Sequence, residues 1–203
     1  MANRKRKSRR HYVYIFLGSF VAAALVSGAS ELFMQKLSLF WATVFLLVVI
    51  LVNILFDIIG IAATAATEAP QHARAANRVF GARHAVYIVR HADVVANFAN
   101  DVVGDITGTV SGAMAASIIA DLVRYAPKLS ASEVWLNTFM LALVASITVT
   151  GKAVGKTFAI REANNIIAAV GAVLATVEKV TGRQFGVQKK RGGNNNGSAR
   201  KHS

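Results

Sequence analysis

The polar side chains best suited to hold a cation lie inside an apolar stretch, residues 93–120, that is long enough to cross a bilayer. They are Asn97, Asp101 and Asp105, and Asn100 lies in the same stretch. Because residues three or four apart share one side of a helix, a helix here would gather acids and amides together. A carboxylate at the centre of a bilayer costs roughly 2.5–3.5 kcal/mol, so this side is expected to face protein or water rather than lipid.

Charged and hydroxyl groups on neighbouring apolar stretches could join the same pocket, because carboxylate, carbonyl and hydroxyl oxygens are the ligands of a hard cation such as Mg²⁺. We expect Asp101 and Asp105 to act as metal ligands. The alternative is a structural cluster of salt bridges and hydrogen bonds, in which Lys152 neutralises the acids. Such a cluster only fixes the register of the helices. The predicted ion pathway or buried polar pocket consists of Asp57, Asn97, Asp101, Asp105, Thr107, Thr109, Thr150 and Lys152.

Glycines at helical spacing indicate where helices pack closely. Gly104, Gly108 and Gly112 recur every four residues, and without side chains they let another helix approach the backbone. Gly151 and Gly155 are expected to do the same on a later helix. The pattern leaves open whether the partner helix belongs to the same chain or to a second copy.

Composition and charge favour a membrane protein. Of the 203 residues 54% are hydrophobic, and the net charge of +13 is concentrated in residues 4–10 and 189–201. Basic segments beside apolar spans are typical of the cytoplasmic side and attract anionic lipid. Nucleic-acid binding is not expected, because no recognition motif accompanies the basic residues. The absence of cysteine excludes disulfides, thiolate metal sites and cysteine catalysis.

The expected fold class is all-α: a multi-pass helical membrane protein with about four transmembrane helices, an interfacial helical pair and a juxtamembrane helix. A basic cytoplasmic arm, 1–11, precedes a transmembrane helical domain, 12–180, and a flexible basic tail, 181–203. Outside segments hold only Lys36, Arg124 and Lys128 of the 23 Lys and Arg residues, which places both termini in the cytoplasm. The spans are predicted at 12–29, 37–66, 93–120 and 134–150.

Proline and glycine residues predict where the connections between the helices lie. Pro70 is expected to stop the second span, because proline disfavours a helical residue before it. Gly81 should divide residues 71–90 into two amphipathic pieces at the inner leaflet. Ser132 is a candidate cap for the fourth span, and residues 160–180 should continue as an amphipathic helix.

Two motifs that suggest other chemistry are better explained otherwise. The segment 150–157, TGKAVGKT, resembles a phosphate-binding loop, but Thr150 stands where that loop needs glycine and no strand precedes it. His84 and His91 are seven residues apart, wider than a usual helical zinc pair, and fit an interfacial basic face. No nucleophile with a base and no metal-ligand triad is visible, so an enzyme is not expected.

From about residue 57 to 167 the chain resembles the transmembrane domain of the CNNM/CorC family of magnesium transport proteins, without the CBS domains that commonly follow. The likeness is carried by IIGIAATAATEAP followed by GARHAVYIVRHADVV, by NDVVGDITGTVSG, and by GKAVGKTFAIREANNI. It implies that Gly104, Asp105 and the segment from Gly151 to Lys156 form the site region. Lys152 stands where the family has an acid, Gly155 where it has proline, and Asp105 where it has asparagine, whereas Lys156 is kept.

The expected function is therefore cation transport or homeostasis, with Mg²⁺ as the bound or transported ion and no other cofactor. The alternative is a non-transporting membrane scaffold or interaction protein, in which Asp105 and Lys152 form a structural pair. Expected partners are the lipid bilayer, anionic lipid at the basic tails and a second copy in a homodimer.

Overall fold

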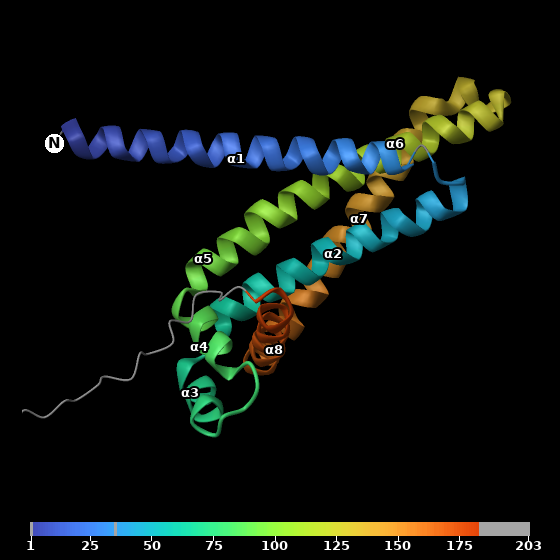
Figure 1. Cartoon of the computed structure of the whole chain (residues 1–203). Coiled ribbons are helices and arrows are strands. Elements are labelled where there is room, and N and C mark those ends of the chain that lie inside the picture. Colours follow the sequence, from blue (N-terminus) through green and yellow to red (C-terminus); the bar gives the residue numbers. More distant parts are fainter. Residues whose placement is uncertain (1, 35, 183–203) are drawn as a thin grey trace, which may run out of the picture.

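The computed structural model describes residues 2–34 and 36–182, with side chains described for 13, 16–34 and 36–182. All regular structure in these ranges is helical (Figure 1), which confirms the predicted all-α, multi-pass membrane fold. The elements are α1 (Ala2–Met34), α2 (Leu39–Ala65), α3 (Glu68–Ala76), α4 (Ala82–Arg90), α5 (Ala92–Asn97), the π-helix η1 (Phe98–Val103), α6 (Gly104–Tyr125), the 3-10 helix η2 (Pro127–Ser132), α7 (Glu133–Arg161) and α8 (Ala163–Thr181).

Within the described ranges, five helical segments are long and apolar enough to cross a membrane: Phe16–Met34, Leu39–Ala65, Ala92–Tyr125, Pro127–Arg161 and Ala163–Thr181. The fifth is α8, which the sequence analysis assigns to the juxtamembrane region. In Figure 1 α8 is seen nearly end-on, whereas α2, α6 and α7 run lengthwise. Its axis therefore differs from that of the bundle.

The bundle is built from α2, α6 and α7, which pack against one another, while α1 contacts α6. The apolar run of α2 supplies Leu46 and Ile50, which meet Val110 and Met114 of α6 and Val144 of α7. These side chains are almost fully buried. Burying side chains of this size stabilises a fold by about 1.5–3 kcal/mol each, so this apolar cluster holds the three helices together.

A second apolar cluster lies at the opposite end of α2, where α4, α7 and α8 pack against it. It contains small residues such as Ala62, Ala85 and Ala159 around Ile88 and Ile167. Small side chains let helix backbones approach closely. The short helices α3 and α4 are thereby fixed against α8 beside the bundle (Figure 1).

Several predicted boundaries differ from the structure. Helix α2 ends at Ala65, and Pro70 lies in the first turn of α3, where its missing N–H removes no helical hydrogen bond. The chain changes direction at Ala66 and Thr67, both with extended ψ angles near 150°. Helix α7 continues past the predicted end at 150 to Arg161. Helix α1 starts at Ala2, so residues 2–11 of the predicted basic arm are part of the first helix.

Other connections agree with the sequence analysis. Gly81 separates α3 from α4 with a φ of 77°, a left-handed conformation that glycine adopts without strain. Ser132 occupies the N-cap position of α7, although its side chain makes no capping hydrogen bond. Of the predicted basic tail, only 181 and 182 fall within the described residues.

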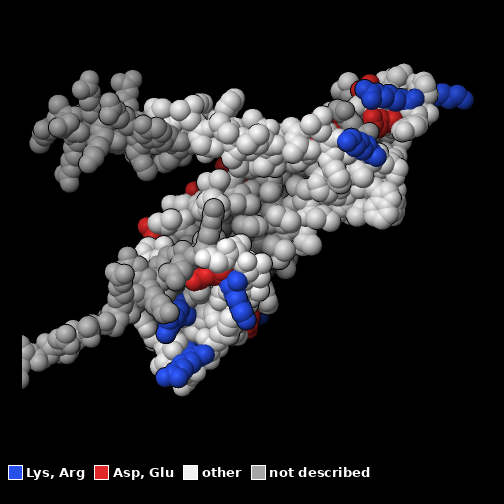
Figure 2. Space-filling model, in the orientation of Figure 1, with Lys and Arg blue, Asp and Glu red and all other residues white. Residues whose placement is uncertain are grey.

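Charged side chains gather at the two ends of the molecule on the face shown in Figure 2. Lys and Arg lie at both ends, and the surface between them is mostly uncharged apart from Asp and Glu along one edge. Uncharged surface of this kind suits the hydrocarbon layer, and basic ends suit the headgroups.

Candidate functional site

A polar cluster lies between the helices of the otherwise apolar bundle. We define it as Asn53 and Asp57 of α2, Asn100 of η1 and Lys152 of α7. Asn53 and Asp57 are one helical turn apart and therefore share a face of α2. The Lys152 ammonium lies 3.4 Å from the Asp57 carboxylate, with 30% and 16% of their side chains exposed.

Two glycines make room for this polar cluster. A Cβ atom on Gly104 would lie 3.8 Å from both Asn53 Oδ1 and Lys152 Nζ, so these two polar atoms border the same patch of bare backbone. A Cβ atom on Gly60 would overlap the Asn100 amide, approaching its Cγ to 2.7 Å. Asn100 can therefore pack against α2 only because residue 60 has no side chain.

Two oxygen atoms of the cluster are buried without a donor in the described part of the chain. They are Asn53 Oδ1 and Asn100 Oδ1; Gln71 and Asn137 hold similar oxygens elsewhere. A buried acceptor left unpaired costs about 1–3 kcal/mol. Asn53 precedes Asp57 by four residues, and Gly60, which Asn100 meets, follows Asp57 by three, so both oxygens border the face of α2 that carries this carboxylate. Unpaired oxygens on such a face attract a cation or a water molecule.

The π-helix η1 positions Asn100. Its wide turn spans Phe98–Val103, between the α-helical residues of α5 and α6. π-Helical turns insert one extra residue into a helix and occur often at functional sites. Ala99 is buried, and Asn100 is half-buried against α2.

The two predicted metal ligands lie outside the polar cluster. Asp101 and Asp105 are exposed, and the ion pair of Lys152 is formed with Asp57 rather than with Asp105. Successive helical residues point about 100° apart. Because Asn100 and Gly104 face α2, the residues that follow each of them point away. Within the described residues, no group of three or more His, Asp or Glu side chains could hold a metal ion.

The remaining predicted pocket residues are also spread out. Asn97, Thr109 and Thr150 are exposed, and Thr107 is half-buried. Thr107 Oγ1 donates to the Val103 carbonyl at 2.7 Å, and Thr109 Oγ1 donates to the Asp105 carbonyl at 2.8 Å. These hydroxyls bond to their own helix, as Thr often does. Of the eight predicted residues, the structure brings together Asp57 and Lys152.

Asn53 and Asn100 belong to the cluster although the sequence analysis does not assign them to the site. Asn53 is 2% exposed. The signal that could have found it is an amide in the middle of an apolar run, four residues before Asp57. Asn100 could be found only by knowing that a π-helix turns it toward α2.

The predicted packing glycines serve different contacts. Gly151 and Gly155 of α7 face Ile54 and Ile58 of α2, where added Cβ atoms would collide. Gly104 and Gly108 face Asn53, whereas Gly112 has no atom within 4 Å of an added Cβ. Gly104 and Gly108 of α6 are thus packed against another helix of the chain, whereas Gly112 faces open space in the described structure.

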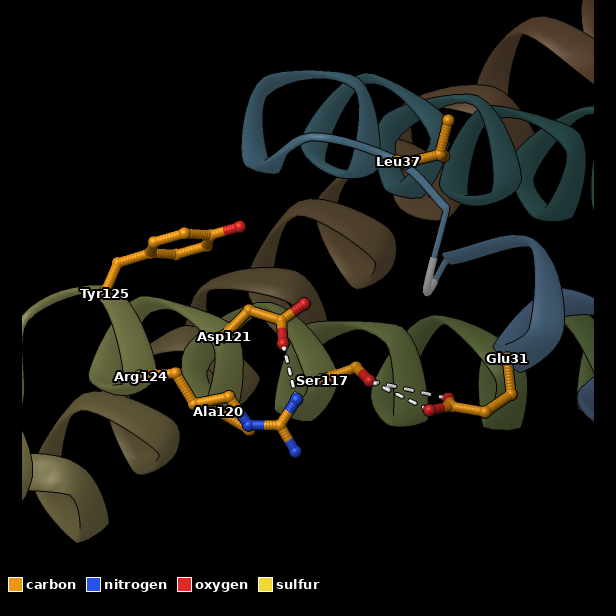
Figure 3. A pocket seen from close by; sticks show the side chains of 7 residues that line it. All are labelled: Glu31, Leu37, Ser117, Ala120, Asp121, Arg124 and Tyr125. Atoms are coloured by element: carbon orange, nitrogen blue, oxygen red, sulfur yellow. Dashed lines mark hydrogen bonds and ion pairs between the residues drawn. The ribbon is translucent and has the colours of Figure 1, made fainter.

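A second polar feature lies at the far end of the bundle. A cavity of about 690 Å³ is lined by Glu31, Leu37, Ser117, Ala120, Asp121, Arg124 and Tyr125. In Figure 3 Ser117 points toward Glu31, and Arg124 is paired with Asp121 at 3.3 Å. The apolar cluster around Leu46 and Met114 separates this cavity from the polar cluster along the helices.

At the opposite end, polar contacts link α3, α4 and α8. The Asn164 side chain accepts a hydrogen bond from the Thr67 N–H at 3.0 Å, and the Gln71 amide donates to the Asn164 carbonyl at 2.9 Å. Hydrogen bonds from His72 and Arg90, together with their positive charge, lower the pKa of Glu68. His84 contacts Glu178 at 2.5 Å across the α4–α8 contact. These contacts join the short helices to the end of the bundle.

Comparisons with protein-family models, curated proteins and solved structures find no match to this chain.

Proposed function

We propose that this membrane protein transports a hard cation such as Mg²⁺, or controls its level, through the polar cluster. The observation that supports this most directly is the pair of buried oxygens of Asn53 and Asn100, which have no hydrogen-bond partner among the described residues and border the face of α2 that carries Asp57. Oxygen atoms of amides and carboxylates are the ligands that Mg²⁺ accepts, and it commonly keeps several waters as well. An ionisable group inside a membrane helix bundle commonly marks an ion pathway.

Lys152 has the central role in this mechanism. Its ammonium lies where it neutralises Asp57 and borders the same glycine surface as Asn53. An arriving cation would compete with this tethered charge for Asp57. Lys152 therefore sets the affinity of the site, and its movement away from Asp57 opens it.

The resemblance to the CNNM/CorC transmembrane domain adds support. It marks the region of Gly104, which borders the cluster, and the region of Lys152, which belongs to it. We further propose that the protein lies in the cell membrane with the α3, α4 and α8 end in the cytoplasm. Four spans, with α8 at the membrane surface, then place both termini in the cytoplasm.

The test is Mg²⁺ flux into proteoliposomes that contain the purified full chain and a Mg²⁺-sensitive dye. Asp57→Asn should abolish the flux. Lys152→Gln should lower the Mg²⁺ concentration for half-maximal flux by about tenfold or more, because the cation no longer competes with the lysine for Asp57. A charge pair at this spacing is worth on the order of 1–4 kcal/mol.

The control is Lys128→Gln, which removes an exposed lysine of η2, far from the polar cluster. It should leave flux unchanged. Wild-type flux in a folded Asp57→Asn protein would overturn the proposal.

The Asp57–Lys152 ion pair also favours a second candidate function, a non-transporting scaffold. Here the pair fixes the register of α2 against α7, and the protein acts by recruiting partners. No Mg²⁺ flux would then be found in any variant, and the pair would matter only for stability.

A further inference from the structure

The turn between α3 and α4 presents apolar side chains to the outside. Val79 and Phe80 are 51% and 59% exposed. They are flanked by Arg78 and Arg83, which are exposed as well. We call these four residues the hairpin tip. An aromatic and a branched aliphatic side chain between two arginines form a surface that is both apolar and basic.

The backbone of the hairpin tip is fixed by its neighbours. The Val79 N–H donates to the Arg74 carbonyl at 3.0 Å, and the Ala82 N–H donates to the Val79 carbonyl at 3.1 Å. Gly81 lies against the backbone of Gly171 and Ala172 in α8, leaving no space for a Cβ atom. Arg78 has a φ of 55°, an uncommon conformation for a residue with a side chain. This arrangement keeps Val79 and Phe80 turned outward.

The hairpin tip is also tethered close to the membrane surface. Ala66 and Thr67 join α2 to α3, and His91 joins α4 to α5, so both ends of the hairpin are attached to spanning helices. Each hairpin helix has nine residues and is about 13 Å long. The polar layer on each side of a bilayer is on the order of 5–8 Å thick. A hairpin of this length keeps its tip among the lipid headgroups when it lies along the bilayer surface rather than standing upright on it.

We propose that the hairpin tip is a lipid contact that prefers anionic headgroups. Val79 and Phe80 enter the boundary between headgroups and acyl chains, and Arg78 and Arg83 bind phosphate groups. Apolar insertion combined with basic charge is the usual basis of binding at a membrane surface. Arginine suits this role because its planar guanidinium binds phosphate through two hydrogen bonds.

A lipid surface fits these observations better than a soluble partner, because the tether already holds the tip at the membrane and its charge complements that of an anionic leaflet. The contact would also pin the ends of α2 and α5 at a defined depth. This inference does not depend on cation transport, since it rests on other residues.

The experiment uses the full chain in lipid nanodiscs. The protein has no cysteine, so Val79→Cys provides a single labelling site for an environment-sensitive fluorophore. Discs of phosphatidylcholine alone are compared with discs that also contain phosphatidylglycerol, and a quencher attached to the acyl chains reports insertion. We expect blue-shifted, quenchable emission that strengthens in the anionic discs.

Arg78→Asn and Arg83→Gln, made in the labelled protein, should each lower the ratio of inserted to exposed label in anionic discs by about fivefold, and the two together by more. Asparagine is chosen at position 78 because it tolerates positive φ. The control is Arg161→Gln with Lys179→Gln, which removes the same charge from exposed positions outside the hairpin tip and should leave the ratio unchanged.

Solvent-like emission that is equal in both kinds of disc would overturn the proposal. So would an equal response to both pairs of substitutions, because the effect would then come from net charge alone. A spectral shift that requires added RNA would reassign the surface to a soluble polyanion and would also contradict the proposal.

Discussion

The ion pair of Asp57 and Lys152 has a different role in each candidate function: it controls cation binding in the transporter and fixes helix register in the scaffold. It lies inside an apolar bundle with 16% and 30% side-chain exposure, so solvent screens it only in part. Breaking such a pair leaves one charge without its partner, which costs more than removing both. The energetic coupling between these two residues can therefore be measured separately from transport.

We expect Asp57→Asn or Lys152→Met alone to destabilise the protein by about 1–4 kcal/mol, and the double variant to be less destabilised than the sum of the two. Thermal unfolding in detergent provides the measurement. Additive effects would show that the two charges do not interact. A coupled pair with no Mg²⁺ flux in any variant supports the scaffold.

The sequence allowed a partial prediction of the site. The inward location of Asp57 and Lys152 follows from charge within apolar helices. The outward location of Asp101 and Asp105 could not be predicted, because one residue of helical rotation decides whether a side chain faces α2 or turns away. Asn100 faces α2 and its neighbour Asp101 is exposed, and the spacing of polar residues alone does not distinguish the two.

At the scale of elements, the packing of α4 on α8 depends on missing side chains. An alanine at Gly171 would place its Cβ 2.7 Å from the Gly81 carbonyl oxygen and 2.8 Å from the Ala85 nitrogen. Both are backbone atoms, which cannot move aside as a flexible side chain can. The contact therefore tolerates little added volume.

Gly171→Ala should destabilise the protein by about 1–3 kcal/mol, because overpacking forces the two helices apart. Gly28→Ala is the control, since nothing lies within 4 Å of an added Cβ at Gly28, and alanine favours a helix. Differential scanning calorimetry or a thermal fluorescence assay would compare them. An unchanged unfolding temperature for Gly171→Ala would contradict the close packing seen here.

Helices were easier to predict than their ends. Hydrophobic runs located the main spans, and Gly81 marked the break between α3 and α4. The end of α2 was predicted within one residue, but the role of Pro70 was wrong, because proline is accepted in the first turn of a helix as well as after one. The π-helix at Phe98–Val103 leaves no distinctive local pattern, so sequence alone described residues 93–120 as one regular helix.

At the scale of the whole molecule, α6 leaves polar groups on the outside of the bundle. Asp101 and Asp105 are exposed, and Gly112 faces open space. Carboxylates exposed to lipid are costly, so we expect a second copy of the chain to cover this face. A homodimer through α6 is one of the two arrangements that the glycine spacing leaves open.

Gly112→Cys should form a cross-linked dimer when native membranes are treated with a short bifunctional thiol reagent. The cysteine-free chain ensures that any product comes from this position. Ala145→Cys on the exposed side of α7 is the control and should react far less. Equal cross-linking at both positions would argue against a dimer through α6.

The apolar cluster of Leu46, Ile50, Val110, Met114 and Val144 has a consequence for kinetics. It lies between the polar cluster and the cavity beside Glu31, so apolar side chains separate the two in the described part of the chain. An ion crossing here would have to wait for helices to separate, and such motions take microseconds to milliseconds. Bilayer electrophysiology should accordingly record no unitary conductance, because turnover would follow the slow cycle of a carrier.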